Sequence, residues 1–368
     1  MNRLQQLHDA GVSIWLDTLS RELLDSGAFE ALIAGDAVTG ATSNPTIFAK
    51  AITTSDRYDE QLRDATGTRS LQELFFLIAL DDVGRAADLL LPAFRASSGR
   101  DGFVSFECTP DLADDTGATI EQALALWDRL DRANVMIKVP ATEAGVPAIE
   151  ELTARGVNVN VTLLFSVERY EQVIDAYVAG LERRVSAGQP VGAIASVASF
   201  FVSRVDAKVD AVLPPGSRLR GQAAIANARH AYVRYCERFA GPRWTALRDR
   251  GANPQRPLWA STGTKDPAYS DVLYVEQLIA PGVVNTMPEH TLRAFADHGR
   301  AARTLHATDP AAEATLRQVQ EAGVDLDAIT AELEREGVRA FCDSYRELLD
   351  SIETRLGRLS HLGGLTNR

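Results

Sequence analysis

A lysine lies in an apolar run of the sequence, where a charged side chain is costly. Residues 134–142 read NVMIKVPAT, so Lys138 has apolar neighbours on both sides and Pro140 ends the run. A short apolar run of this kind is typical of a buried strand, and lysine is almost never fully buried without a partner or a function. Schiff-base chemistry is one such function, because an amine must be neutral to attack a carbonyl and burial disfavours the ammonium form.

Other polar residues recur at alternate positions of similar runs. One face of VSIWLD ends in Asp17, and one face of FVSFEC ends in Glu107. One face of VNVNVTLLF carries Asn160 and Thr162. Successive side chains of a strand point to opposite faces, and the other faces of these runs are apolar. We therefore expect the polar set to converge with Lys138 in a shared interior, where carboxylates can move protons.

Each of these residues also has an ordinary structural explanation. A lone aspartate after a strand is often a helix cap, and an asparagine in a strand can simply satisfy a neighbour's hydrogen bond. Glu107 could be an ion-pair partner, and Lys138 could pair with Glu107 or Asp17 for stability alone. The joint pattern of a lysine, carboxylates, amides and a hydroxyl on inward faces favours a catalytic site.

The elements that would position these residues alternate along the chain. Eight apolar runs read as strands, and amphipathic stretches with apolar residues three or four apart separate them. Such alternation predicts an α/β protein with a parallel sheet, and eight strands favour a closed (β/α)8 TIM barrel with additional helices over an open, doubly wound sheet. No GxGxxG follows the first run, which weakens a dinucleotide-binding interpretation. The runs cover residues 12–17, 37–43, 103–108, 135–140, 157–165, 191–200, 257–262 and 282–288.

The whole chain is expected to form one elaborated domain. Residues 1–368 contain no low-complexity linker, and residues from about 300 to 368 read as a C-terminal helical extension of the barrel.

The net charge of −12 argues against a nucleic-acid or anionic-membrane partner. Three widely spaced cysteines, the lack of a signal-peptide core and the lack of about 18 consecutive apolar residues predict a cytoplasmic protein. None of the six histidines forms HExxH or a comparable pair, so we expect neither a metal site nor a cofactor.

A series of longer motifs follows the same order along the chain. Together they resemble the transaldolase family, in particular a longer bacterial subfamily, and weaker similarity continues into the C-terminal helices. The resemblance implies a metal-free class I aldolase-type barrel of the non-oxidative pentose phosphate pathway. Such an enzyme moves a dihydroxyacetone unit reversibly from sedoheptulose 7-phosphate or fructose 6-phosphate to glyceraldehyde 3-phosphate or erythrose 4-phosphate. The motifs are WLDTLSR (15–21), TSNPTIF (42–48), SFEC (105–108), MIKVPAT (136–142), GVNVNVTLLFS (156–166), ASFFVSR (198–204) and LWASTGTKD (258–266).

The resemblance also implies the catalytic roles. Lys138 would be the Schiff-base lysine. Glu107 would act as the general acid and base through a bound water, which Thr162 would hold. Asp17 would take the proton from the C4 hydroxyl of the donor sugar as the C3–C4 bond breaks.

Further residues are implied in substrate binding. Asn44 and Asn160 would bind donor hydroxyls or hold the dihydroxyacetone unit, and Ser199 matches a position near the terminal hydroxyl of the donor. Arg204 and Ser261 match phosphate-site positions after the sixth and seventh runs, where TIM barrels tend to bind phosphate.

The chain departs from the better-known members of the family after Ser261. Those members have a second arginine shortly after the serine, whereas this chain reads TGTKD. We expect Lys265 to supply the second charge, as a point charge without the bidentate fork of arginine.

Two other functions fit parts of the pattern. An aldolase could use the same lysine and release free dihydroxyacetone, although such relatives are usually much shorter. A sugar-phosphate-binding protein could keep the pocket without catalysis, but the intact set of Asp17, Glu107 and Lys138 argues against it. A monomer and a homodimer both remain open.

Overall fold

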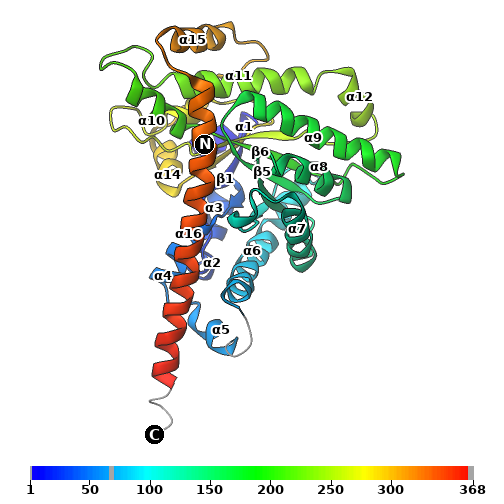
Figure 1. Cartoon of the computed structure of the whole chain (residues 1–368), viewed down its shortest axis with the longest axis vertical. Helices are drawn as coiled ribbons and strands as arrows, with labels where there is room; N and C mark the ends of the chain where they lie inside the picture. Colours follow the sequence, from blue (N-terminus) through cyan, green and yellow to red (C-terminus); the bar gives the residue numbers. More distant parts are fainter. Residues whose placement is uncertain (1, 66–69, 364–368) are drawn as a thin grey trace.

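Eight parallel strands close into a barrel in the computed structural model of the chain, which describes residues 2–65 and 70–363 (Figure 1). Each strand pairs with the next one along the chain, and β8 returns to β1. This is the predicted (β/α)8 TIM barrel. Residues 1, 66–69 and 364–368 of the predicted 1–368 domain lie outside the described residues. The strands are β1 (Ser13–Leu16), β2 (Val38–Thr42), β3 (Val104–Glu107), β4 (Val135–Pro140), β5 (Val159–Leu164), β6 (Ser196–Phe201), β7 (Arg256–Ala260) and β8 (Val284–Met287).

Each of the eight predicted runs overlaps one of these strands, although β6 and β7 each extend one residue beyond the predicted run. The sixth differs most, because the run was expected over 191–200 and β6 begins at Ser196. A turn precedes it, in which the Ile194 N–H donates to the Val191 carbonyl at 3.1 Å. The apolar residues before Ser196 are therefore buried in a turn and not in the sheet.

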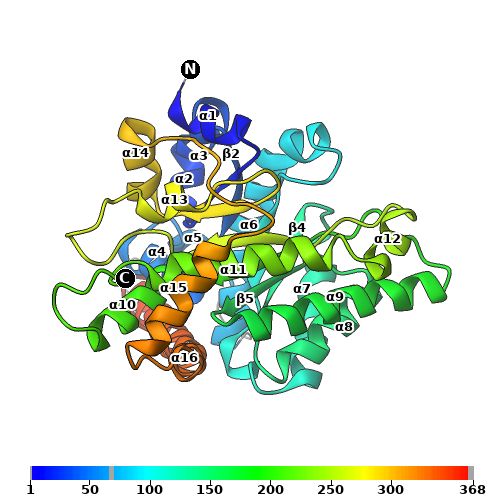
Figure 2. The same ribbon diagram turned by 90° about the horizontal axis from the view of Figure 1, so that it is seen from above.

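Helices surround the barrel in the described part of the chain, as the view from above shows (Figure 2). The helix α6 begins with a capping box, in which Ser70 and Glu73 each accept a hydrogen bond from the other's backbone N–H. The helices are α1 (Arg3–Asp9), α2 (Arg21–Asp25), α3 (Ala28–Gly35), α4 (Pro45–Thr54), α5 (Asp59–Asp64), α6 (Leu71–Ala96), α7 (Thr116–Leu130), α8 (Gly145–Arg155), α9 (Val167–Ser186), α10 (Ser203–Val212), α11 (Ala223–Arg238), α12 (Pro242–Arg248), α13 (Leu273–Gln277), α14 (Glu289–His298), α15 (Pro310–Glu321) and α16 (Leu326–Gly363), with a short 3-10 helix, η1 (Pro110–Leu112).

A tryptophan fills part of the barrel interior. The Trp15 ring is fully buried, and its Nε1–H donates to Asp101 Oδ1 at 2.9 Å. Gly40 of β2 leaves room for the ring, since a Cβ atom at this position would lie 2.4 Å from the indole. Trp15 thus packs the interior below the strand ends where the polar residues lie.

The C-terminal helix α16 crosses the barrel and continues well beyond it (Figure 1). It packs mainly on α4, with further contacts to α10, α6 and β5. Lys208 of α10 bridges two carboxylates of α16, Glu332 at 2.8 Å and Glu336 at 2.7 Å. Arg355 pairs with Asp59 of α5 near the other end of α16. Within the described residues, no helix combines the length and the apolar character needed to cross a membrane.

Candidate active site

A cavity of about 170 Å³ lies at the C-terminal ends of the barrel strands. In TIM barrels this is the end that carries the active site. All but two of the sequence-predicted site residues line it, and the two exceptions, Glu107 and Asn160, lie on β3 and β5 beside residues that do. The predicted residues that line the cavity are Asp17, Asn44, Lys138, Thr162, Ser199, Arg204, Ser261 and Lys265.

Lys138 and Glu107 form a buried ion pair. Strand register places Glu107 of β3 beside Lys138 of β4, which in turn lies beside Asn160 of β5. The Lys138 Nζ lies 3.2 Å from Glu107 Oε2, and the two side chains are only 6% and 5% exposed. The Nζ also donates to the Ser43 carbonyl at 3.3 Å. The pairing considered from the sequence is therefore present, at the edge of an open cavity.

Burial raises the pKa of the Glu107 carboxyl above its ordinary value. The positive charge of Lys138 acts in the opposite direction, and the negative charge of Asp17 adds to the increase. A glutamate of this kind holds its proton at a higher pH than one on the surface. The raised pKa brings the carboxyl closer to the range in which a group can both donate and accept a proton.

The strand β5 is irregular around Thr162, near the Lys138–Glu107 ion pair. Its register against β6 shifts between Val161 and Leu164, and Leu163 has a left-handed φ of 59°. Such a bulge re-aims side chains, and Thr162 lines the cavity. Among the described residues, Thr162 Oγ1 is buried without a hydrogen-bond partner, and Glu107 Oε2 has no partner besides the Lys138 ammonium of the ion pair. Both oxygens can thus bind a water molecule or a substrate hydroxyl.

Asp17 follows β1 and is held by the neighbouring strand. The Asp17 N–H donates to the Met287 carbonyl at 2.8 Å, and its Oδ1 accepts from Thr42 Oγ1 at 2.9 Å. The Thr42 hydroxyl also lies 3.0 Å from Thr286 Oγ1. The sequence argument missed both threonines, although Thr42 begins the TSNPTIF motif. Their position at the end of a strand was the signal that could have identified them.

The two predicted asparagines differ in how exposed they are to the cavity. Asn44 caps α4, where its side-chain oxygen accepts from the Ile47 N–H at 3.1 Å. Its amide nitrogen remains available to the cavity. Asn160 is fully buried, donates to Ser105 Oγ at 2.9 Å and accepts from Ser199 Oγ at 2.7 Å. In this arrangement Asn160 orients Ser199, and Ser199 contacts the cavity.

Two cations lie at the side of the cavity formed by β6 and β7. Arg204, in the first turn of α10, and Lys265, in the loop after β7, have no hydrogen bond or ion pair within the described part of the chain. Burial lowers the pKa of the Arg204 guanidinium, which still leaves it charged at neutral pH. Ser261 between them has a φ of 56°, and its Oγ lies 2.9 Å from Ser203 Oγ. Two cations without an ion-pair partner beside a cavity are an arrangement that could hold an anion, and we call this group (Arg204, Ser261 and Lys265) the candidate anion site.

Aromatic side chains cover the cavity on two sides. Phe201 is the last residue of β6, and the Arg204 guanidinium lies 5.4 Å from its ring centroid. Phe341 reaches the cavity from α16. Neither residue was predicted. No local pattern could have identified Phe341, because it is one apolar position of a long amphipathic helix.

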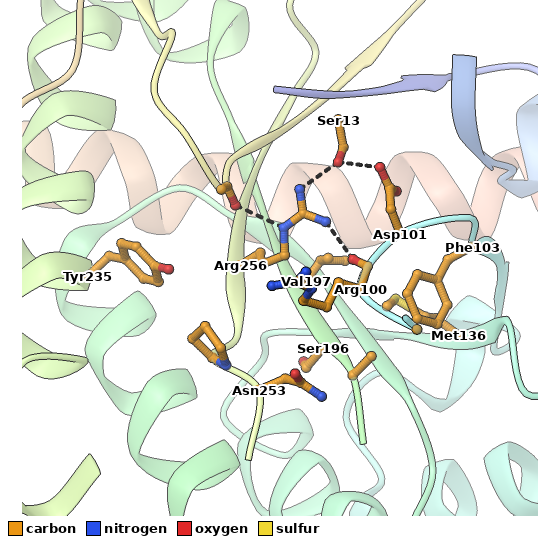
Figure 3. A pocket seen from close by; sticks show the side chains of 14 residues that line it. Ser13, Arg100, Asp101, Phe103, Met136, Ser196, Val197, Tyr235, Asn253 and Arg256 are labelled. Atoms are coloured by element: carbon orange, nitrogen blue, oxygen red, sulfur yellow. Dashed lines mark hydrogen bonds between the residues drawn. The ribbon is translucent and has the colours of Figure 1, made fainter. Parts of the chain in front are cut away.

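A larger cavity, of about 340 Å³, lies at the opposite end of the barrel (Figure 3). The Arg256 guanidinium there donates to Ser13 Oγ and to the carbonyls of Arg100 and Gly282. Asp101 in turn accepts from Ser13. The charged groups at its centre are thus already paired with the protein, whereas Arg204 and Lys265 are not. We therefore assign the chemistry to the smaller cavity.

Within the described residues, no group of three or more histidine, cysteine, aspartate or glutamate side chains could hold a metal ion.

Comparison with known proteins identifies a family for the chain. The family model described as Transaldolase/Fructose-6-phosphate aldolase matches residues 14–352. A protein of Thermobifida fusca named Transaldolase is 52% identical over 360 residues, which are 96% of this chain and 98% of that protein. A Transaldolase of Frankia alni is 50% identical over 365 residues, 97% of this chain and 98% of its own length. Transaldolase 1 of Streptomyces avermitilis is 51% identical over 363 residues, with 97% and 96% coverage.

Proposed function

The chain belongs to the transaldolase/fructose-6-phosphate aldolase family, and we propose that it is a transaldolase that works through a Schiff base on Lys138. Sedoheptulose 7-phosphate and glyceraldehyde 3-phosphate are converted reversibly to erythrose 4-phosphate and fructose 6-phosphate. The observation that carries the proposal is the buried Lys138 amine, which lines a cavity with a carboxylate 3.2 Å from it and unpaired cations on one side. Relatives of about half-identical sequence carry the same name.

Catalysis begins at the lysine. The Lys138 ammonium first passes a proton to the Glu107 carboxylate 3.2 Å away. The free amine then attacks the C2 carbonyl of the donor, and loss of water from the carbinolamine gives an iminium. Glu107 gives and takes the protons of these steps, through a water held by Glu107 Oε2 and Thr162 Oγ1. The raised pKa of Glu107 supports this role, as does the lack of another hydrogen-bond partner for either oxygen in the described chain.

Bond cleavage follows on the same iminium. Asp17 takes the proton from the C4 hydroxyl as the C3–C4 bond breaks, and the electron pair moves to C3, where the iminium stabilises it. The hydrogen bond from Thr42 to Asp17 Oδ1 holds this carboxylate in place. An acceptor aldehyde then adds to C3, and the reversed steps release the new sugar.

The remaining residues bind the sugar. Asn44 and Ser199 contact donor hydroxyls, and Asn160 fixes Ser199 through its 2.7 Å hydrogen bond. Arg204, Ser261 and Lys265 bind the phosphate. The absence of other partners for the two cations within the described residues supports this assignment.

The central experiment traps the covalent intermediate. Borohydride reduces the iminium to a stable amine, and peptide mass mapping after incubation with fructose 6-phosphate locates the adduct. The chain has four lysines, Lys50, Lys138, Lys208 and Lys265, so the assignment is unambiguous. We expect the adduct on Lys138, its loss in Lys138→Ala and its retention in Lys208→Ala. An adduct on Lys265, the other amine of the cavity, would refute the mechanism.

A second function shares this chemistry. The family model also covers fructose-6-phosphate aldolases, which would release free dihydroxyacetone. Fructose 6-phosphate turnover with and without erythrose 4-phosphate separates the two. We expect turnover to depend on the acceptor. A comparable rate without acceptor would favour the aldolase, and the absence of any trapped adduct would favour a binding protein without catalysis.

A further inference from the structure

Two aspartates one turn apart on α10 anchor the loop that follows β7 and the short helix α13 that comes after it. The Tyr269 hydroxyl donates to Asp210 Oδ2 at 2.6 Å, and the Tyr274 hydroxyl donates to Asp206 Oδ2 at 2.9 Å. Both aspartates are buried, with exposures of 6% for Asp210 and 1% for Asp206. Hydrogen bonds to an ionised acceptor are short and roughly twice as strong as neutral ones. The loop is therefore tied firmly to the helix.

The segment before α11 completes this anchor. The second oxygens of the two carboxylates accept backbone N–H groups, Asp210 from Gly221 at 3.0 Å and Asp206 from Ala224 at 2.8 Å. Gly221 has a φ of +72°, and a Cβ atom there would lie 2.9 Å from Cζ of Tyr269. A residue without a side chain is thus needed for the Tyr269 ring to reach Asp210. The helix, the segment and the loop meet at this point.

The same helix and the same loop each carry one cation of the candidate anion site. Arg204 lies in the first turn of α10, on the helix that also holds Asp210. Lys265 lies in the loop, four residues before Tyr269. Between Lys265 and Tyr269, the backbone N–H groups of the described chain make local hydrogen bonds to Asp266. The Asp266 carboxylate also lies 4.0 Å from the Arg220 guanidinium, a long contact between partly exposed groups. The 2.6 Å hydrogen bond at Tyr269 is therefore the stronger of the two contacts that hold this part of the loop, and with it Lys265, relative to Arg204.

We propose that Tyr269 is a positioning residue for phosphate recognition, because its hydrogen bond to Asp210 holds Lys265 across the candidate anion site from Arg204. This inference rests on the proposed function, in which both cations bind the phosphate of the donor. With the hydrogen bond in place the loop is ordered before substrate arrives. Without the hydrogen bond, phosphate binding must order the loop. The free-energy cost of that ordering then weakens the affinity for phosphate.

The variant Tyr269→Phe removes the hydroxyl and keeps the ring. We expect its KM for fructose 6-phosphate to rise about two- to fivefold, with kcat within about twofold of the parent. The inhibition constant of inorganic phosphate should rise by the same factor. Borohydride trapping with dihydroxyacetone, which has no phosphate, should be unchanged. An unchanged KM, or an equal loss with dihydroxyacetone, would overturn the inference.

A matched control and a double variant make this test specific. Tyr177→Phe also removes a tyrosine hydroxyl that is hydrogen bonded, at 2.7 Å to the Asn253 carbonyl, but at the far end of the barrel. It should leave KM unchanged. In a Lys265→Ala background, Tyr269→Phe should have no further effect on KM, since residues that act as a unit are not additive. A full additional effect would show that Tyr269 does not act through Lys265.

The failure of this inference can be distinguished from the failure of the proposed function. If Lys265→Ala raises the KM and Tyr269→Phe does not, the positioning role alone is wrong. If neither Arg204→Gln nor Lys265→Ala affects phosphate inhibition, the assigned phosphate site is wrong.

Discussion

The candidate anion site makes a selective prediction for Arg204→Gln. This arginine is partly buried, and within the described chain it has no other hydrogen bond or ion pair. A hydrogen bond to a charged group contributes about 1.5–3 kcal/mol, and arginine can form two such bonds with one phosphate. Taking a net loss of about 3 kcal/mol, kcat/KM for fructose 6-phosphate should fall by roughly 150-fold. Lys265 is exposed and acts as a point charge, so Lys265→Gln should lose only about fivefold.

Steady-state assays with fructose 6-phosphate and erythrose 4-phosphate measure this loss. The control reaction is trapping with dihydroxyacetone, which reaches Lys138 without a phosphate group. Arg204→Gln should leave the trapping rate within about twofold of the parent, and a thermal unfolding scan checks that the variant is folded. Equal losses in both reactions would mean that Arg204 supports the site in general. In that case it does not bind the phosphate.

Three other changes test separate features of the structure. Glu107→Gln should bind fructose 6-phosphate but form the trapped adduct slowly, and a normal trapping rate would remove Glu107 from its role. Gly40→Ala places a Cβ atom 2.4 Å from the buried Trp15 ring and should lower the free energy of unfolding by about 2–4 kcal/mol in urea titrations; an unchanged midpoint would contradict this. Burial raises the pKa of Asp206 to about 6 from an ordinary value of 3.8, which means that the folded protein favours the protonated carboxyl. The contribution of Asp206 to the free energy of unfolding is therefore complete below pH 3.8 and is lost as the pH rises through 6. Relative to Asp206→Asn, the parent should therefore lose up to about 3 kcal/mol of unfolding free energy between pH 4 and pH 8, and parallel pH profiles of the two proteins would disagree with this.

The strands were predictable because their signal is local. A period of two and a short apolar run identify a buried strand wherever it lies, and the alternation with helices implied the barrel. The same parity placed Lys138 on an inward face. It could not predict the 3.2 Å contact with Glu107, because that distance depends on the register between two strands, which no single run encodes.

The remainder of the site depends on contacts between distant segments. Phe341 reaches the cavity only because α16 crosses the barrel, and its spacing in the helix is the same as for any packing residue. The hydrogen bond of Tyr269 to Asp210 joins the loop after β7 to α10, which comes before β7 in the chain. Short motifs identify residues that act in chemistry. They do not identify the neighbours that hold those residues in place.

The path of α16 has a consequence for the protein while it is being synthesised. All barrel strands, with Asp17, Glu107 and Lys138, precede Phe341 in the chain, so they are synthesised before it. Protein synthesis proceeds at about 5–20 residues per second, so for some seconds the nascent strands carry Lys138 without the last aromatic wall of the cavity. We expect aldehydes to reach Lys138 most freely during this interval, which ends when α16 packs on the barrel.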